Sequence, residues 1–275
     1  MKLNMKRNLI VLMALAMIGL SSFEAAAQEK EIAIVAHRGF WNCDQAGKAK
    51  NSLAALEQAQ KNDFWGSEFD VNMTKDGELL VFHDGNVEGK CIEKNPASVF
   101  EYYRLKNGES IPTLDEYLIQ AKKYPETMLV YELKKHSGKK AESKAVRLSI
   151  KKLKEYDLFS PDKVMFISFS KHICKEFARL APGFTVQYLD MDANPDELVK
   201  YGINGIDIRH KVLRSNKHMF DRARANGMSI NTWTVNKEED IRKMIELGVD
   251  QITSDYPLLV RQLLQEMGVK EKKAR

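Results

Sequence analysis

Residues 34–84 read IVAHRGFWNCDQAGKAKNSLAALEQAQKNDFWGSEFDVNMTKDGELLVFHD. Three apolar runs within them end in ionisable groups, at His37-Arg38-Gly39, Glu68-Phe69-Asp70 and His83-Asp84. In a parallel α/β barrel the C-terminal ends of the strands meet at one mouth, where barrel enzymes carry their chemistry. This pattern therefore predicts an active site at the mouth of a barrel.

Along the rest of the chain, short apolar runs alternate with longer segments of helical periodicity, which predicts βα units and a parallel sheet. We expect strands at 32–36, 66–70, 79–82, 128–133, 164–168, 185–189, 205–208, 229–233 and 251–253, and helices at 52–62, 113–123, 140–156, 171–180, 195–201, 215–226 and 237–247. The expected fold is a single-domain TIM (β/α)₈ barrel, which has eight strands. One candidate strand is therefore surplus, and the short run 205–208 is the weakest.

The connection from Asp70 to Leu79 is too short for a helical crossover, and residues 74–77 form a turn signal. Either the chain returns along the barrel wall in extended form, or the two strands form a hairpin that carries His83 away from Asp70. We expect the first, because His83 is useful only at the same mouth. Residues 85–111 have weak periodicity and predict a loop insertion after the third strand, which would roof the site.

Residues 1–27 have the layout of a secretory signal peptide, with three basic residues, an apolar run at 9–20 and a small-residue end at Ala27. The apolar run is too short to span a bilayer. We therefore expect a barrel over 28–275, a periplasmic or secreted location and no stable membrane insertion. Removing the segment's net +2 from the formal +5 leaves +3, which is too weak to argue for nucleic acid. Residues 270–275 are expected to be a frayed tail.

The three cysteines, Cys43, Cys91 and Cys174, lack the spacing of a zinc site. In an oxidising compartment Cys43 and Cys91 are the better candidates for a disulfide, because both lie in loops beside the expected mouth. Three unpaired thiols are the favoured interpretation.

Glu68 and Asp70 are spaced i, i+2, which places both carboxylates on one face of a strand, about 7 Å apart. Two buried carboxylates repel each other, and a divalent cation removes this difficulty. Glu132 ends another apolar run and would be a third oxygen ligand, so the pattern indicates one hard cation, Mg²⁺ or Ca²⁺. The alternative is that these acids form ion pairs with Arg38 and Lys134.

His37 and His83 stand at two strand exits beside the acidic residues. A pair of imidazoles can divide general base and general acid between them. Arg38 and Lys134 would add positive charge suited to a phosphoryl group. The combination indicates cleavage of a phosphoryl ester.

An ordered series of motifs runs through nearly the whole chain: AHRG at 36–39, NSLAA at 51–55, ExDVxxTKDGxxxVxHD at 68–84, IPTL at 111–114, YELK at 131–134, ISF at 167–169, TWTVN at 232–236, GVD at 248–250 and TSDYP at 253–257. The series resembles the glycerophosphodiester phosphodiesterase family. The resemblance implies a TIM barrel and metal-dependent hydrolysis of glycerophosphodiesters to glycerol 3-phosphate and an alcohol. Carried over by position, it implies the following roles: His37 and His83 as acid and base, Glu68, Asp70 and Glu132 as metal ligands, Arg38 and Lys134 as phosphate contacts, and Trp233 at the glycerol end of the pocket.

One departure from the family pattern concerns Lys50, which stands where the family usually has a glutamate near the metal. It puts substrate choice in question more than reaction type. The alternatives are a related barrel phospholipase acting on lysophospholipid or phosphoinositide head groups, and a binding protein without turnover. Whether water or the glycerol hydroxyl attacks the phosphorus stays open, as do the preferred alcohol and the oligomeric state.

Overall fold

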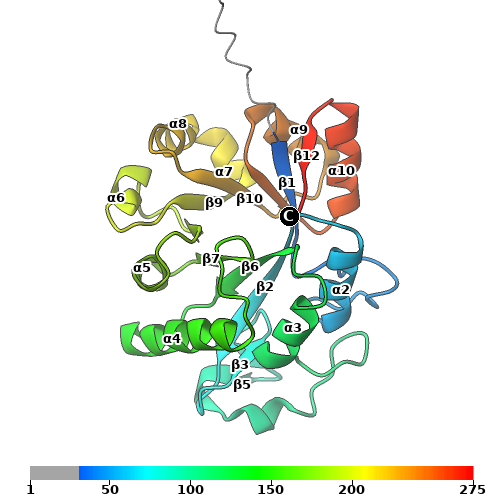
Figure 1. The fold of residues 1–275 in the computed structure, drawn as a ribbon, viewed down its shortest axis with the longest axis vertical. Helices are drawn as coiled ribbons and strands as arrows, with labels where there is room; N and C mark the ends of the chain where they lie inside the picture. The colour runs from blue at the N-terminus through cyan, green and yellow to red at the C-terminus, as the bar shows by residue number, and fades with distance from the viewer. Residues whose placement is uncertain (1–30, 275) are drawn as a thin grey trace, which may run out of the picture. The chain divides into compact units, whose positions relative to one another are not determined.

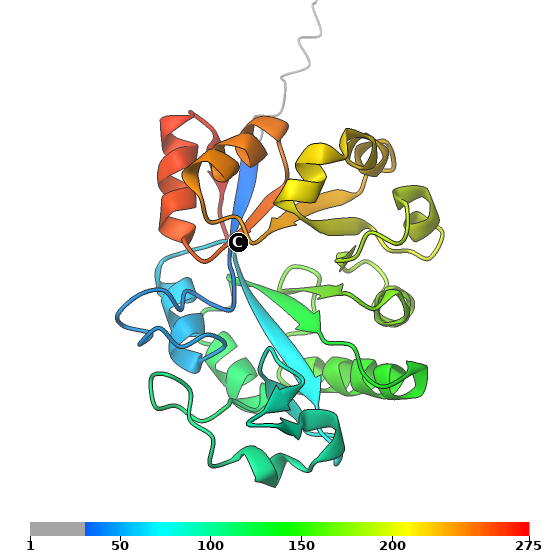
Figure 2. The same cartoon turned by 180° about the vertical axis from the view of Figure 1, so that it is seen from behind.

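The computed structural model describes residues 31–274. The predicted signal peptide, residues 1–27, lies outside them. Figures 1 and 2 show the described part as a closed barrel of strands with helices around it. No helix within residues 31–274 is long and apolar enough to cross a membrane.

Eight parallel strands form the barrel, which confirms the predicted TIM fold. They are β1 (Glu31–Ala36), β2 (Gly66–Met73), β6 (Met128–Leu133), β7 (Val164–Ser168), β8 (Val186–Tyr188), β9 (Gly205–Arg209), β10 (Ser229–Trp233) and β11 (Gln251–Ser254). Each pairs with the next in this order, and β11 pairs with β1. The barrel closes where β1 meets β2, through the pairs Val35–Gly66 and Ala36–Ser67. All the strand C-terminal ends therefore point to one mouth.

The helices surround this barrel (Figure 1). They are α2 (Leu53–Lys61), α3 (Leu114–Ala121), α4 (Lys139–Glu155), α5 (Lys171–Leu180), α6 (Pro195–Val199), α7 (His210–Ser215), α8 (Lys217–Ala225), α9 (Glu238–Leu247) and α10 (Pro257–Glu266). Local signals set several of their ends. Ser52 accepts a hydrogen bond from the Ala55 amide, Thr113 and Glu116 form a capping box, and Gly248 ends α9 in the left-handed conformation with φ 74°.

The expectation that residues 205–208 are the surplus strand was wrong, because β9 is a full strand of the barrel between β8 and β10. The run looks weak because it begins with Gly205. A Cβ atom there would lie 2.4 Å from Ser229 Oγ and 2.5 Å from Gln187 Cγ, side chains of the two neighbouring strands. Glycine is thus needed for close packing across the barrel.

The surplus strand is instead β3 (Leu79–Val81), which pairs antiparallel with β2. The prediction of an extended return was therefore wrong, but His83 still reaches the mouth. β2 runs on to Met73, the chain turns there, and the Phe82 amide then donates to the Asp70 carbonyl oxygen at 2.9 Å. The hairpin projects beyond the mouth and returns to the level of Asp70.

The insertion, residues 85–111, contains β4 (Asn86–Val87), β5 (Lys90–Cys91) and the short 3₁₀ helices Ile92–Lys94 and Ala97–Phe100. Its apolar side chains pack with Leu80 and Ala49 in a small cluster of their own. Figure 2 shows this segment, in teal, beside the C-terminal end of β2. None of its residues lines the central pocket, but Tyr103, Leu105 and Lys106 line an adjoining pocket that shares Arg38 and His83 with it, so the insertion borders the site at one side.

The predicted frayed tail is also wrong, because β12 (Lys270–Lys272) pairs in parallel with β1. β12 occupies the edge of β1 at Glu31–Ala33, below the two residues that pair with β2. Arg261 holds the strand through a 2.7 Å ion pair with Glu271. The three cysteines are unpaired, as favoured.

Candidate active site

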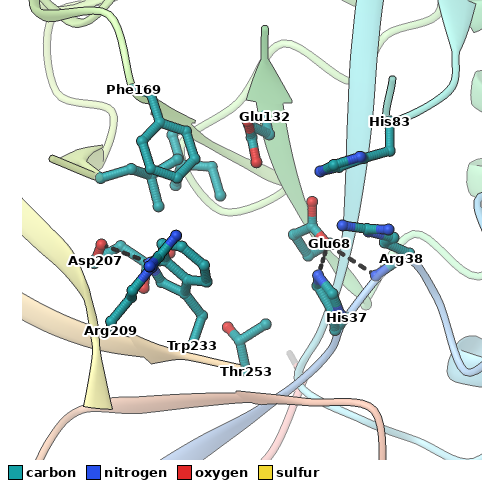
Figure 3. Close-up of a pocket in the computed structure, with 12 residues that line it drawn as sticks. His37, Arg38, Glu68, His83, Glu132, Phe169, Asp207, Arg209, Trp233 and Thr253 are labelled. Carbon is teal, nitrogen blue, oxygen red and sulfur yellow. Dashed lines mark hydrogen bonds and ion pairs between the residues drawn. The ribbon is translucent and has the colours of Figure 1, made fainter. Parts of the chain in front are cut away.

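A pocket with a volume of about 170 Å³ lies at the mouth, between the C-terminal ends of the strands (Figure 3). Its walls are His37, Arg38, Glu68, His83, Glu132, Ile167, Phe169, Leu189, Asp207, Arg209, Trp233 and Thr253. The sequence predicted six of these residues. The other two predicted residues, Asp70 and Lys134, lie beside Glu132, and Lys134 Nζ donates a hydrogen bond to Asp70 Oδ1 at 3.1 Å.

Glu68, Asp70 and Glu132 come together as expected: one carboxylate oxygen from each lies within 4.8 Å of the others. The register of β2 and β6 explains this cluster, since Asp70 is paired with Glu132 and Glu68 is two residues earlier on the same face. All three side chains are buried. Such a cluster of hard oxygen atoms suits a divalent cation.

Asp70 is the best compensated of the three acids. Lys134 Nζ lies 3.1 Å from one carboxylate oxygen, and Arg38 Nε and Asn51 Nδ2 lie 3.3 and 2.8 Å from the other. Burial raises the pKa of Asp70, but Lys134 and Arg38 lower it more, to about 2. The alternative ion pairs with Arg38 and Lys134 are thus present, and they account for Asp70.

Glu68 and Glu132 are less well compensated. Burial, followed by the charges of Asp70 and Glu132, raises the pKa of Glu68 well above its ordinary value. Burial and Asp70 raise the pKa of Glu132 to about 7, although Lys134 Nζ lies 2.7 Å from its carboxylate. Glu68 Oε1 is buried without a hydrogen-bond partner. Two cationic side chains serve three acids, so the residues fit a further positive charge in the form of a metal ion.

His37 is oriented by an acid that the sequence reasoning did not select. Its Nδ1 atom lies 2.8 Å from Asp255 Oδ1, and its Nε2 atom lies 3.9 Å from Glu68 Oε2. Asp255 also accepts hydrogen bonds from Trp41 Nε1 at 3.0 Å and Asn236 Nδ2 at 2.7 Å. Burial raises the pKa of Asp255, but these bonds and the charge of His37 bring it to about 2. The sequence could have indicated Asp255, because this acid directly follows the end of the last barrel strand, β11.

His83 enters the pocket from the end of the β2–β3 hairpin, and Figure 3 shows its ring directed toward Glu68 and Glu132. Its Nδ1 atom lies 2.6 Å from Asp84 Oδ1. Burial lowers the pKa of His83, an effect that Asp70 partly offsets. The two imidazoles thus stand on the same side of the pocket, each with its own carboxylate partner.

The opposite wall carries Trp233 together with groups that were not predicted (Figure 3). Trp233 Nε1 donates to the Asp207 carbonyl oxygen at 3.0 Å, its ring meets Phe169 edge to face at 5.5 Å, and the Arg209 guanidinium lies 5.0 Å from its centroid. Asp207 Oδ1 is buried without a partner. Burial, with the charge of Glu132, raises the pKa of the Asp207 carboxyl well above its ordinary value. This wall offers hydrogen bonds to hydroxyl groups.

Lys50 does not enter the acidic cluster. Its side chain is exposed, and Nζ lies 4.5 Å from the centre of the Trp41 ring. Among the described residues it forms no ion pair with Glu68, Asp70 or Glu132. The neighbouring Asn51 makes the contact with Asp70 instead.

Comparison with known proteins shows the family to which the chain belongs. Residues 37–259 match the model of the glycerophosphoryl diester phosphodiesterase family. The chain belongs to this family. Its members are phosphoric diester hydrolases, so the predicted family and enzyme class are confirmed.

Similar proteins include a glycerophosphodiester phosphodiesterase of Caldanaerobacter subterraneus, which is 27% identical over 261 residues that cover 86% of this chain and 98% of the relative. The crystal structure of a glycerophosphodiester phosphodiesterase from Parabacteroides distasonis has a TM-score of 0.83 at 37% identity, covering 87% of this chain and 99% of that one. An Oleispira antarctica phosphodiesterase, solved in complex with the product sn-glycerol-3-phosphate, shares the fold with a TM-score of 0.71 at 24% identity, covering 85% and 96%.

Proposed function

We propose that this glycerophosphodiester phosphodiesterase uses one divalent cation, Mg²⁺ or Ca²⁺, and an imidazole pair to release glycerol 3-phosphate and an alcohol. The observation that carries the proposal is the buried Glu68 Oε1 atom, which has no partner in a cluster of three acids. Glu68, Asp70 and Glu132 would hold the cation. When bound, it supplies Lewis-acid stabilisation of the phosphoryl oxygens.

Arg38 and Lys134 are placed to hold the phosphoryl group. Both bond to Asp70, so they are fixed in position beside the acidic cluster before substrate arrives. Arg38 can hold two phosphoryl oxygens at once, while Lys134 adds a point charge. Their positive charge favours the transition state, in which negative charge spreads over the phosphoryl oxygens.

His37 is the candidate general base. Asp255 accepts a hydrogen bond from its Nδ1–H group, which would fix the tautomer whose free Nε2 can take a proton from the attacking oxygen. The Asp255 carboxylate then stabilises the imidazolium. His83, in turn, would protonate the departing alcohol. The attacking oxygen is either water or the adjacent glycerol hydroxyl.

The wall opposite the imidazoles would take the glycerol arm of the substrate. Trp233 provides an apolar face, and the unpartnered Asp207 Oδ1 offers a hydrogen bond to a glycerol hydroxyl. A pocket of about 170 Å³ suits a small polar group better than an acyl chain. Residues 1–27 further support a periplasmic or secreted enzyme.

The test is release of glycerol 3-phosphate from glycerophosphoethanolamine, glycerophosphocholine and glycerophosphoinositol by the mature protein, with Mg²⁺, Ca²⁺ or a chelator. We expect release that needs the cation and falls by roughly 10² to 10⁴ in His37→Asn and in His83→Asn. Release that is unchanged by chelator would rule out the cation. Near-normal turnover in both variants would remove the imidazoles from the chemistry.

A further inference from the structure

A second pocket, with a volume of about 260 Å³, adjoins the central one and shares Arg38 and His83 with it. Its other walls come from the loop before α2, at residues 48–51, from the end of the β2–β3 hairpin and from the insertion, at Tyr103, Leu105 and Lys106. The two pockets therefore meet at the two side chains assigned to the phosphoryl group and the leaving alcohol.

The lining of this second pocket is strongly cationic. Besides Arg38 it includes Lys48, Lys50 and Lys106, against one acid, Asp84. Asp84 is bonded to His83, and Lys48 pairs with a carboxylate outside the lining, that of Asp44, at 3.3 Å. Among the described residues, Lys50 and Lys106 form no ion pair. No carboxylate neutralises either ammonium group within this part of the chain, so both can attract an anionic ligand.

A phosphodiester has two ester arms, and the two pockets provide one space for each on either side of Arg38 and His83. The glycerol arm is assigned to the pocket of Trp233 and Asp207. We propose that the second pocket binds the alcohol arm, and that Lys50 and Lys106 select alcohols that carry a phosphate or carboxylate group. This proposal rests on the proposed function and names its substrate class.

The cationic lining of the second pocket disfavours a quaternary ammonium. Such groups are recognised by the open faces of aromatic rings. Lys50 Nζ already lies over the Trp41 ring, 4.5 Å from its centroid, and the Tyr103 ring meets Phe82 edge to face at 5.7 Å. A choline arm would instead lie beside lysine ammonium groups of the same sign, which is unfavourable.

The same argument gives Lys50 a role. In the resemblance to the family this position is usually a glutamate, so the chain differs there by two units of charge. Lys50 lies outside the acidic cluster and lines the second pocket. The departure therefore bears on the alcohol arm rather than on the cation.

The experiment compares kcat/KM for three substrates: glycerophosphoinositol 4-phosphate, glycerophosphoinositol and glycerophosphocholine. The first two differ by a single phosphate on the same alcohol, so their ratio cancels general effects on catalysis. We expect the wild-type enzyme to prefer the phosphorylated substrate by roughly tenfold or more, the effect of about one charged hydrogen bond. Lys50→Glu and Lys106→Gln should each reduce the ratio several-fold. Lys140→Gln, which removes an exposed lysine from a separate groove, should leave it unchanged.

A wild-type ratio near one, or a ratio that falls equally in Lys140→Gln, would overturn the proposal and leave the phosphodiesterase activity standing. Faster turnover of glycerophosphocholine than of both inositol esters would do the same. If none of the three substrates is cleaved with any cation, the proposed function fails, and this inference fails with it.

Discussion

His37 Nδ1 lies 2.8 Å from Asp255 Oδ1, and this contact joins the exits of two neighbouring strands. Ala36 of β1 is paired with Ser254 of β11, so the next residue of each strand reaches the mouth at the same level. The contact leaves His37 Nε2 on the side of Glu68. Barrel closure thus sets the orientation of the imidazole at the acidic cluster.

We expect Asp255→Asn to lower kcat by roughly 10²-fold with little change in KM, because an amide does not fix the His37 tautomer or stabilise an imidazolium. Steady-state kinetics on glycerophosphoinositol measures this. Trp41→Phe is the matched control, since it removes one hydrogen bond to Asp255 but keeps the contact with His37. A variant with wild-type kcat would show that Asp255 has only a structural role.

The same contact predicts a pH dependence of stability. The pKa of Asp255 lies at about 2 instead of 3.8, which corresponds to between about 2 and 3 kcal/mol at about 1.4 kcal/mol per unit. A lowered carboxyl pKa stabilises the fold above the unfolded value, near pH 4, and this contribution is lost as the pH falls toward 2. Unfolding free energies from urea titrations of wild type and Asp255→Asn should therefore differ at pH 5 and converge near pH 2. A difference that is constant with pH would contradict the assignment.

Glu68→Gln should abolish the effect of the cation on stability without weakening the fold itself. Removing one of three buried carboxylates relieves repulsion, so without added metal the variant should be as stable as wild type or more stable, by roughly 1 kcal/mol. Added Mg²⁺ or Ca²⁺ should stabilise the wild-type protein by about 3 kcal/mol at 100 times Kd. The melting temperature of Glu68→Gln should not respond.

The control for Glu68→Gln is Asp162→Asn, which removes an exposed acid. Its melting temperature should rise with the cation as in wild type. An equal rise in Glu68→Gln would place the cation elsewhere.

Much of the site could be predicted from local sequence. His37 and Glu132 lie at the C-terminal ends of barrel strands and Glu68 lies within β2, and all three were recognisable from short apolar runs. Asp255 directly follows β11, so it could have been predicted in the same way. Asp207 was harder to predict, because it lies in β9, and the first residue of that strand, Gly205, made the strand look weak.

The remaining features depend on contacts between distant segments. Lys270–Lys272 are three charged residues with no local strand signal, and they form β12 because β2 leaves the edge of Glu31–Ala33 open. The hairpin was misread because β2 was expected to end at Asp70. Its continuation to Met73 lets an antiparallel partner return to the same mouth.

Asn51 combines a requirement on the backbone with a requirement on the side chain. Its φ of 59° is left-handed, Nδ2 donates to Asp70 Oδ2 at 2.8 Å, and Oδ1 accepts from the Asp70 amide at 3.2 Å. Asn51→Gly keeps the backbone but loses both bonds. We expect cation affinity, measured by calorimetry, to fall roughly 10- to 100-fold, because Asp70 loses the group that orients it.

Asn51→Ala should show the same loss of cation affinity but unfold about 1 kcal/mol more easily than Asn51→Gly, since a Cβ atom disfavours the left-handed conformation. The difference between the two variants therefore measures the backbone, and their shared loss measures the bonds to Asp70. Equal stability of the two variants would refute the backbone argument. Unchanged cation affinity in both would limit Asn51 to a structural role, and the cation would then depend on Asp70 being held by Arg38 and Lys134 alone.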